Sequence, residues 1–335
     1  MNATSYGLPG TTGGNREDLR GPLTILEPEE TPFISATKKG PAPKSTLVEH
    51  GADRLRKPRL TGTREGASGP KGGNKAVKRA RFGSYLHRWL EPFGVTDVQQ
   101  LISENGGNAF VADEYGSAKA KAVRELKRDM EAVACGSQDG QGGSDDEMKS
   151  RGFFKWLAAT QTPQIPDDFL CPAGQRLTGQ ASLLESGANS LNAVLKSIKK
   201  QTGGRPELDG ICGNDYQENA DLFTRTGPET TYSRYRVQEN ASSHEISLMV
   251  KVFSSSFARV NLIPSEFVNI DSVGDGNAKA IQLVNRRLWE VLFLEGLHSA
   301  DEDPDAGGQS GYCKAIGGLF CLEPRGNGYI VNTLN

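Results

Sequence analysis

The side chains that could perform acid–base or metal chemistry are few and far apart in this sequence of 335 residues. No two histidines lie closer than 37 residues, and none belongs to an HExxH or HxH arrangement of the kind that binds zinc. The cysteines are odd in number and form no CxxC pair, so the sequence predicts neither a disulfide framework nor a zinc site. These side chains are His50, His87, His244, His298, Cys135, Cys171, Cys212, Cys313 and Cys321.

Acidic clusters and glycine-rich turns also fail to form a recognisable site. The segments "SDDE" (144–147) and "DEDPD" (301–305) could attract a divalent cation, but neither has the spacing of a calcium loop. The segments "GPKGGNK" (69–75) and "GDGNAK" (274–279) match no phosphate-binding or dinucleotide-binding motif, and no GxSxG elbow is present. We therefore predict a protein that is not an enzyme, with no catalytic residue, bound metal or cofactor.

Charge is concentrated in residues 51–82, which hold ten Lys or Arg against Asp53 and Glu65. The segment carries a charge of +8 in a chain of net charge −2, so the other residues sum to −10. Lysine and arginine bind phosphates or acidic protein surfaces, and no aromatic residue precedes Phe82 in the segment to stack on bases.

Three interpretations fit this basic segment: a solvated linker, a nucleic-acid arm, or a projecting two-stranded arm that lies on the acidic surface of another copy. The third interpretation makes ten side chains candidates for inter-subunit contact. They are Arg54, Arg56, Lys57, Arg59, Arg64, Lys71, Lys75, Lys78, Arg79 and Arg81.

The segments on either side of the basic stretch predict how it is held. "STLVEH" (45–50) and "RFGSYLHRWLEPFGV" (81–95) are β-like and can pair as the base of a ribbon. A helix is predicted over 110–135, because apolar residues there recur at steps of three and four. Since its other faces are charged, we expect a thin helix lying across a sheet and not a core helix. The apolar positions are Val111, Tyr115, Ala118, Ala122, Leu126, Met130 and Val133.

The second half of the chain alternates helical and extended patterns. A second amphipathic helix is predicted over 179–202, ended by Gly203 and Gly204. A buried strand at 208–212 and a helix at 214–223 follow. Strands are then predicted at 246–252, 258–262, 288–294 and within 312–332.

Composition excludes some classes of protein. No apolar run approaches the roughly 18 residues that a membrane-spanning helix needs, and the first twenty residues lack the hydrophobic region of a signal peptide. We therefore expect no membrane partner and a cytosol-like compartment. The 40 glycines predict abundant loops and extended segments.

Four segments, taken in order, carry a resemblance to a known family. They are "GNREDLRGPLTILEPEETPFISA" (14–36), "RFGSYLHRWLEPFGVT" (81–96), "KAVRELKRDMEAV" (121–133) and "LNAVLKSIKKQTGGRPELDGICGN" (191–214). These segments resemble the major capsid proteins of tailed phages that have the Johnson fold, the Hong Kong phage type. The resemblance covers nearly the whole chain.

The resemblance implies an α+β fold with a defined order of parts. These are an N-terminal arm (1–30), a link (31–43), an extended β-ribbon loop (44–97), a peripheral domain (98–149) with a long spine helix at about 110–135, an α/β axial domain (150–240), and return strands (241–335) shared by the axial and peripheral domains.

It also implies a function. The chain would assemble with itself into hexamers and pentamers of an icosahedral shell, enclose double-stranded DNA bound non-specifically on the inner face, and meet a portal and scaffold or decoration proteins. It would be assembled in the host cytoplasm and reside in the virion. An encapsulin-type compartment is the alternative with the same fold, and it should lack the long arm and so large a basic ribbon. A cytosolic enzyme is a further alternative, but it would need a polar constellation that the sequence does not offer.

Overall fold

The computed structural model is a mixed α/β protein that divides into two compact units. The first unit comprises Met1–Glu29, Leu90–Leu126 and His298–Lys314, and the second comprises Glu30–Trp89, Lys127–Leu297 and Ala315–Asn335. The expected N-terminal arm lies outside the described residues. The structure describes residues 31–55, 58, 60, 62, 64–66, 79–105, 111, 113–143, 147–158, 164–178, 181–182, 189–222, 251–268, 279–303, 307–331 and 333–334.

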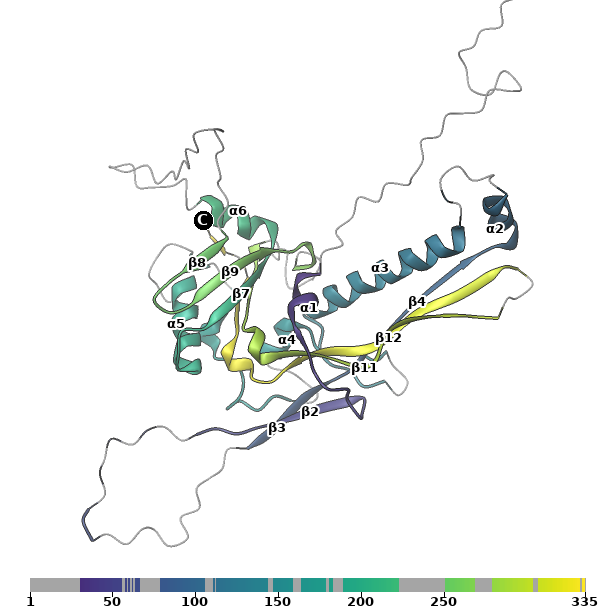
Figure 1. The fold of residues 1–335 in the computed structure, drawn as a ribbon. Coiled ribbons are helices and arrows are strands. Elements are labelled where there is room, and N and C mark those ends of the chain that lie inside the picture. Colours follow the sequence, from purple (N-terminus) through teal and green to yellow (C-terminus); the bar gives the residue numbers. More distant parts are fainter. Residues whose placement is uncertain are drawn as a thin grey trace, which may run out of the picture. The chain divides into compact units, whose positions relative to one another are not determined.

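The first unit holds helix α2 (Asp97–Glu104), the first half of helix α3 (Glu114–Cys135), most of strand β4 (His87–Val95) and the tips of strands β11 (Trp289–Asp301) and β12 (Gln309–Cys321). Figure 1 shows this part of α3 running beside the strands. The strands belong to a sheet of order β1-β11-β12-β4, in which β1 (Lys38–Lys39) pairs in parallel with β11.

Tyr115 fixes the beginning of α3 to these strands. Its ring packs against Phe93 of β4 with a centroid distance of 5.4 Å, and its hydroxyl donates a hydrogen bond to Asp301 at 2.9 Å. Lys119, one turn further along the helix, pairs with the same carboxylate at 2.9 Å. Burial and the neighbouring Asp301 raise the pKa of Tyr115 to about 12, so this hydroxyl stays a donor at neutral pH.

Helix α3 confirms the predicted apolar stripe, because Ala122, Leu126 and Met130 are all buried. The helix begins at Glu114, four residues later than predicted. Its last turn differs from the prediction of a thin helix outside the core. Ala134 and Cys135 belong to a buried cluster, and the Cys135 carbonyl accepts a 2.7 Å hydrogen bond from the buried side chain of Gln282.

The second unit contains a six-stranded sheet of order β5-β13-β10-β7-β9-β8. Strands β7 and β9 are parallel, whereas β10 pairs antiparallel with both β7 and β13. Helices α5 (Leu191–Thr202) and α6 (Asn214–Leu222) supply Val194, Leu195, Ile198 and Tyr216 to the core of this sheet. The strands are β5 (Arg176–Leu177), β13 (Gly328–Ile330), β10 (Ile281–Val284), β7 (Glu207–Cys212), β9 (Arg259–Pro264) and β8 (Val252–Ser254).

A second core in the same unit is aromatic. Trp289 stacks on Phe153 at 5.2 Å and meets Phe33 edge-on at 5.8 Å, so helix α4 (Phe153–Leu157) and helix α1 (Pro32–Ala36) pack on the start of β11. Aromatic pairs of this geometry add about 0.5–1.5 kcal/mol each beyond the area that they bury.

The start of α1 is held by a buried carboxylate. Glu131 of α3 is fully buried and accepts hydrogen bonds from the backbone amides of Phe33 (2.6 Å) and Ile34 (2.9 Å). The first amides of a helix have no partner within the helix, and Thr31 makes no side-chain cap here. Glu131 therefore takes the capping role from a distant part of the chain.

Most of the other predicted elements are present. The structure has strand β7 where 208–212 was predicted, β9 at 258–262 and β11 at 288–294. Strands β12 and β13 lie within the predicted 312–332, and helix α6 lies at the predicted 214–223. The predicted strand at 246–252 lies mostly outside the described residues, and only its end is seen, in β8. The short 3-10 helices are η1 (Ala173–Gln175), η2 (Glu266–Val268), η4 (Arg286–Leu288) and η5 (Pro324–Gly326).

Two predicted elements are wrong in extent. The helix predicted over 179–202 begins only at Leu191, because Ser190 accepts a hydrogen bond from the Ala193 amide as an N-cap. Upstream of it, β6 (Ala181–Ser182) pairs with β14 (Thr333–Leu334). The single strand predicted over 81–95 is divided at Leu86, whose amide bonds to the carbonyl of Thr46. Within the described part of the chain, no helix is long and apolar enough to cross a membrane.

Candidate subunit-contact site

The base of the basic segment forms a two-stranded antiparallel ribbon, as predicted. Strand β2 (Leu47–Ala52) pairs with β3 (Ala80–Tyr85), and the register runs from Leu47 opposite Tyr85 to Ala52 opposite Ala80. Figure 1 shows the two strands as a separate ribbon in the second unit. The residues between the strands include all the basic candidates except Arg81, which lies within β3.

A close backbone contact holds the ribbon together at Gly83. A Cβ atom at this position would lie 1.8 Å from the carbonyl oxygen of Val48 and 2.8 Å from the Cα of Glu49. No side chain can be placed at such distances without moving the opposite strand. The absence of a side chain at Gly83 therefore permits the observed approach of β2 to β3.

Arg151 anchors the ribbon to the second unit from within. Its side chain is fully buried, and its guanidinium donates to the Gly83 carbonyl at 2.6 Å and to Asp139 at 2.8 Å. Its backbone amide donates to the hydroxyl of Ser84 at 2.9 Å. Burial lowers the pKa of Arg151 from its ordinary value, while the Asp139 carboxylate opposes this shift and stabilises the charged form.

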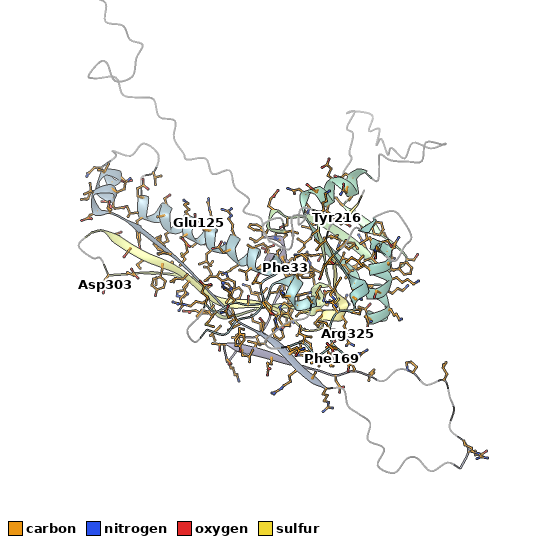
Figure 2. All side chains as sticks on the ribbon, turned by 180° about the vertical axis from the view of Figure 1, so that it is seen from behind. Phe33, Glu125, Phe169, Tyr216, Asp303 and Arg325 are labelled. Carbon is orange, nitrogen blue, oxygen red and sulfur yellow. The ribbon has the colours of Figure 1, made fainter. Side chains whose placement is uncertain are left out.

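A second anchor joins the ribbon to the segment around Phe169. Buried Phe82 of β3 packs against Phe169 with a centroid distance of 5.9 Å. Arg325 covers the same ring at 5.2 Å, and Figure 2 shows the two side chains next to each other. Arg54 donates to both the carbonyl (2.8 Å) and the carboxylate (3.1 Å) of Asp168. The root of the ribbon is thus fixed by contacts within its own subunit.

Four of the ten predicted contact residues lie in the described part of the chain. Arg54 pairs with Asp168 as above, Arg79 pairs with Asp53 at 3.0 Å, and Arg81 approaches Glu49 at 3.8 Å. The side chains of Arg79 and Arg81 are 76% and 79% exposed, so water screens both pairs strongly. Exposed Arg64 makes no ion pair with any described residue. Outside the described residues are Arg56, Lys57, Arg59, Lys71, Lys75 and Lys78.

The basic segment also presents two apolar side chains to solvent. Leu55 is 98% exposed and Leu60 is 101% exposed, so neither gains any burial within its own chain. The net charge of the segment did not point to these leucines as contact residues. A large apolar side chain held between cationic residues in this way is suited to insertion into a partner surface.

Residues that could carry catalysis are not assembled in the described structure. Among the described residues, no group of three or more His, Cys, Asp or Glu side chains is arranged to hold a metal ion. The five cysteines are buried and form no disulfide, and burial raises the pKa of Cys171 and Cys212 to about 12, which removes thiolate character. Burial likewise lowers the pKa of His87 to about 4.

A cleft of about 1210 Å³ lies in the second unit, and charged residues of both signs line part of it. Arg286 pairs with Asp209, and Arg325 makes two hydrogen bonds to Glu323 at 2.6 and 2.9 Å. The cleft thus contains ion pairs that stabilise the subunit. Among the described residues, no Cys, Ser or His lines this cleft.

Solved structures with the same fold are phage-type capsids. The capsid of a native GTA particle is 10% identical with a TM-score of 0.60, and covers 99% of this chain and 100% of its own. The capsid of cyanophage A-1(L) is 13% identical with a TM-score of 0.61, and covers 96% and 98%. The capsid of cyanophage P-SCSP1u is 12% identical with a TM-score of 0.55, and covers 100% and 99%. No curated protein matches the sequence.

At these identities the likeness concerns the fold alone. The sequence itself matches the family model described as SU10 major capsid protein over residues 3–333, which is nearly the whole chain. The chain therefore belongs to the SU10 major capsid protein family, and it is a structural component of the virion and not an enzyme.

Proposed function

We propose that this chain builds the icosahedral shell of a tailed phage and encloses its double-stranded DNA. Copies form hexamers and pentamers, and the inner face meets the genome without sequence preference. A portal and scaffold or decoration proteins complete the particle, which is assembled in the host cytoplasm. The family match over residues 3–333 is the observation that carries this proposal.

We assign the parts of the chain to a Hong Kong-type arrangement. Residues 1–30 are the N-terminal arm, 31–43 the link, 44–97 the extended loop, 98–149 the peripheral domain with α3 as its spine, 150–240 the axial domain and 241–335 the return strands. The β2–β3 ribbon and the 22-residue helix α3 support this assignment, because they lie where the arrangement has the base of its extended loop and its spine helix.

The ribbon is proposed as the principal contact with a neighbouring copy. Its root is tied to its own subunit through Arg151, Phe82 and Arg54. Beyond the root, exposed Arg64 and the two exposed leucines have no partner among the described residues of their own chain. These groups gain contacts only when a neighbour covers them, which couples their burial to assembly.

Electron microscopy of the purified protein, combined with nuclease treatment, tests the proposal. We expect closed particles of icosahedral symmetry, and particles isolated from lysed host cells should protect double-stranded DNA from nuclease. Particles that protect a protein cargo and no DNA would instead indicate a compartment, and the lack of any closed particle would contradict the shell function.

A further inference from the structure

A small cavity lies within the second unit, between the last turns of α3 and strands β11 and β12. Its volume is about 10 Å³, which is close to the space that a single water molecule needs. Every residue that lines it belongs to the second unit. Eight of the ten lining residues have no nitrogen or oxygen atom in their side chains, and the other two are Trp89 and Ser150.

Trp89 and Ser150 bring polar atoms into the protein interior without a protein partner. Ser150 is fully buried and Trp89 is 7% exposed. Neither the Oγ atom of Ser150 nor the Nε1 atom of Trp89 has a hydrogen-bond partner among the described residues. A buried polar group that loses its hydrogen bonds to water and gains none in exchange destabilises the folded state. Two such groups on one small cavity therefore point to a shared ligand.

The other two tryptophans of the chain show that Trp89 is an exception. Trp156 donates from Nε1 to the carbonyl of Leu319 at 3.1 Å, and Trp289 donates to the side chain of Asn327 at 2.8 Å. Both of these side chains are fully buried. Buried tryptophans thus find an acceptor elsewhere in this fold, as such side chains usually do.

The packing around the two side chains holds them in place. The Trp89 ring stacks on His87 with a centroid distance of 4.6 Å. Ser150 lies against the backbone of β12, where a Cβ atom at Gly318 would come within 3.0 Å of the Ser150 Cβ atom. The next residue, Arg151, anchors the ribbon through its buried hydrogen bonds. Moving Ser150 to close the cavity would therefore disturb that anchor.

The chemistry of the lining selects water from among small ligands. None of the described residues that line the cavity is Asp, Glu, Lys or Arg, so an ion would be buried there without an opposite charge. The volume leaves no room for an organic molecule. Water can accept a hydrogen bond from the indole N–H of Trp89 and at the same time donate one to the hydroxyl oxygen of Ser150.

We propose that one water molecule occupies this cavity and bridges Trp89 to Ser150. The water joins the start of β4 to the residue that precedes Arg151, so it belongs to the contacts that hold the root of the ribbon. Buried polar groups that are fully satisfied in this way make the local structure more rigid. The inference concerns the folded subunit and is independent of the proposed shell function.

A density map of the full-length protein at a resolution that shows ordered water tests the proposal, from crystals of the subunit or from particles. We expect one peak at hydrogen-bonding distance, about 2.5–3.2 Å, from both Trp89 Nε1 and Ser150 Oγ. A cavity without density, or a direct hydrogen bond between the two side chains, would overturn the proposal.

A double-mutant cycle tests the bridge in solution. Trp89→Phe and Ser150→Ala each remove one partner of the water, so the double variant should lose less in melting temperature than the sum of the two single losses. Trp289→Phe is the matched control, because its indole has its own acceptor and its effect should add to that of Ser150→Ala. Additive losses for Trp89→Phe and Ser150→Ala would contradict the bridge. If a variant does not fold, the map of the wild type decides.

Discussion

At the scale of single residues, Glu131 and Arg151 hold positions that the sequence pattern did not predict. Both have ionisable side chains, and such side chains are rarely fully buried unless they are paired. Their partners lie far away in the chain: Glu131 meets Phe33 across 98 residues, and Arg151 meets Gly83 across 68. Periodicity describes only local neighbours. It found the apolar stripe of α3 but could not show that Glu131, beside Met130, turns inward with it.

Glu131 should give the subunit a pH-dependent stability. Burial raises the pKa of this carboxyl from 4.5 to about 7, although the amides of Phe33 and Ile34 favour its charged form. The folded state therefore binds more protons than the unfolded state between these values. The stabilisation is complete below about pH 4.5 and is lost as pH rises through about 7.

Glu131→Gln removes this proton equilibrium. We expect the variant to lose the fall in unfolding free energy between pH 5 and 8 that Glu131 causes in the wild type, a difference on the order of 3 kcal/mol. Urea denaturation of unassembled subunits at both pH values measures it. If the unfolding free energy changes equally with pH in the variant and in the wild type, Glu131 keeps the same charge when the chain is folded and unfolded.

Arg151→Met should loosen the root of the ribbon. The change leaves the Gly83 carbonyl and the Asp139 carboxylate without their buried donor, and breaking a buried ion pair in this way costs about 3–5 kcal/mol. We expect faster hydrogen exchange of the β3 amides and a lower melting temperature. Arg81→Met is the control, because that side chain is exposed and loosely paired. Equal effects of the two variants would argue against Arg151 as an anchor.

At the scale of elements, the sequence predicted the type of most helices and strands but not where they stop. The spacing of Ala122, Leu126 and Met130 gave α3 correctly, because burial follows that spacing. The leucines before Ser190 extended the predicted α5 too far, since local pattern does not reveal that Ala181 and Ser182 pair with a strand at the other end of the chain. Leu86 divides β3 from β4 because each strand joins a different partner.

The pairing of β2 with β3 should depend on the lack of a side chain at Gly83. Gly83→Ala would place a methyl group against the Val48 carbonyl, so we expect the strands to separate locally, at a cost of about 1–3 kcal/mol. Gly51→Ala on the facing strand is the matched control, because a Cβ there meets nothing within 4 Å. Gly83→Ala should unfold at a lower temperature and exchange its strand amides faster than Gly51→Ala. Identical behaviour of the two variants would contradict the close approach.

At the scale of the whole molecule, the candidate site was only partly predictable. The ten basic residues remain a prediction from composition, whereas the base of the ribbon was predicted from the β-like segments 45–50 and 81–95 and is present as β2 and β3. The ion pairs with Asp53, Glu49 and Asp168 were not predicted, because a count of charges does not say which opposite charge is nearest. The exposed leucines needed the structure, since exposure is a property of the folded chain.

Assembly should weaken as salt is added, and Arg64 should contribute to this dependence. Charges on exposed surfaces interact over about 10 Å at 0.1 M salt and about 3 Å at 1 M. Arg64→Glu reverses a charge that has no ion pair among the described residues, so the subunit should fold normally. Light scattering across a salt series should show less assembly by the variant and a flatter salt dependence.

The control for Arg64→Glu is Arg64→Gln, which removes the charge without reversing it and should fall between the variant and the wild type. Assembly of all three proteins with one common salt dependence would show that the basic segment meets no acidic surface.

The ribbon is fixed to its own subunit at its root, whereas Leu55, Leu60 and Arg64 are exposed, and this affects how the sequence can change over generations. Substitutions near Gly83, Phe82 and Arg151 are selected through their effect on the folding of the subunit. Substitutions around Leu55, Leu60 and Arg64 are selected only through their effect on the proposed contact with a neighbouring copy. Because one gene encodes both the loop and the surface that it meets on a neighbour, a change in the loop and its compensation enter every copy together. Shells mixed from two diverged relatives should therefore fail first at this contact, while each relative still assembles with itself.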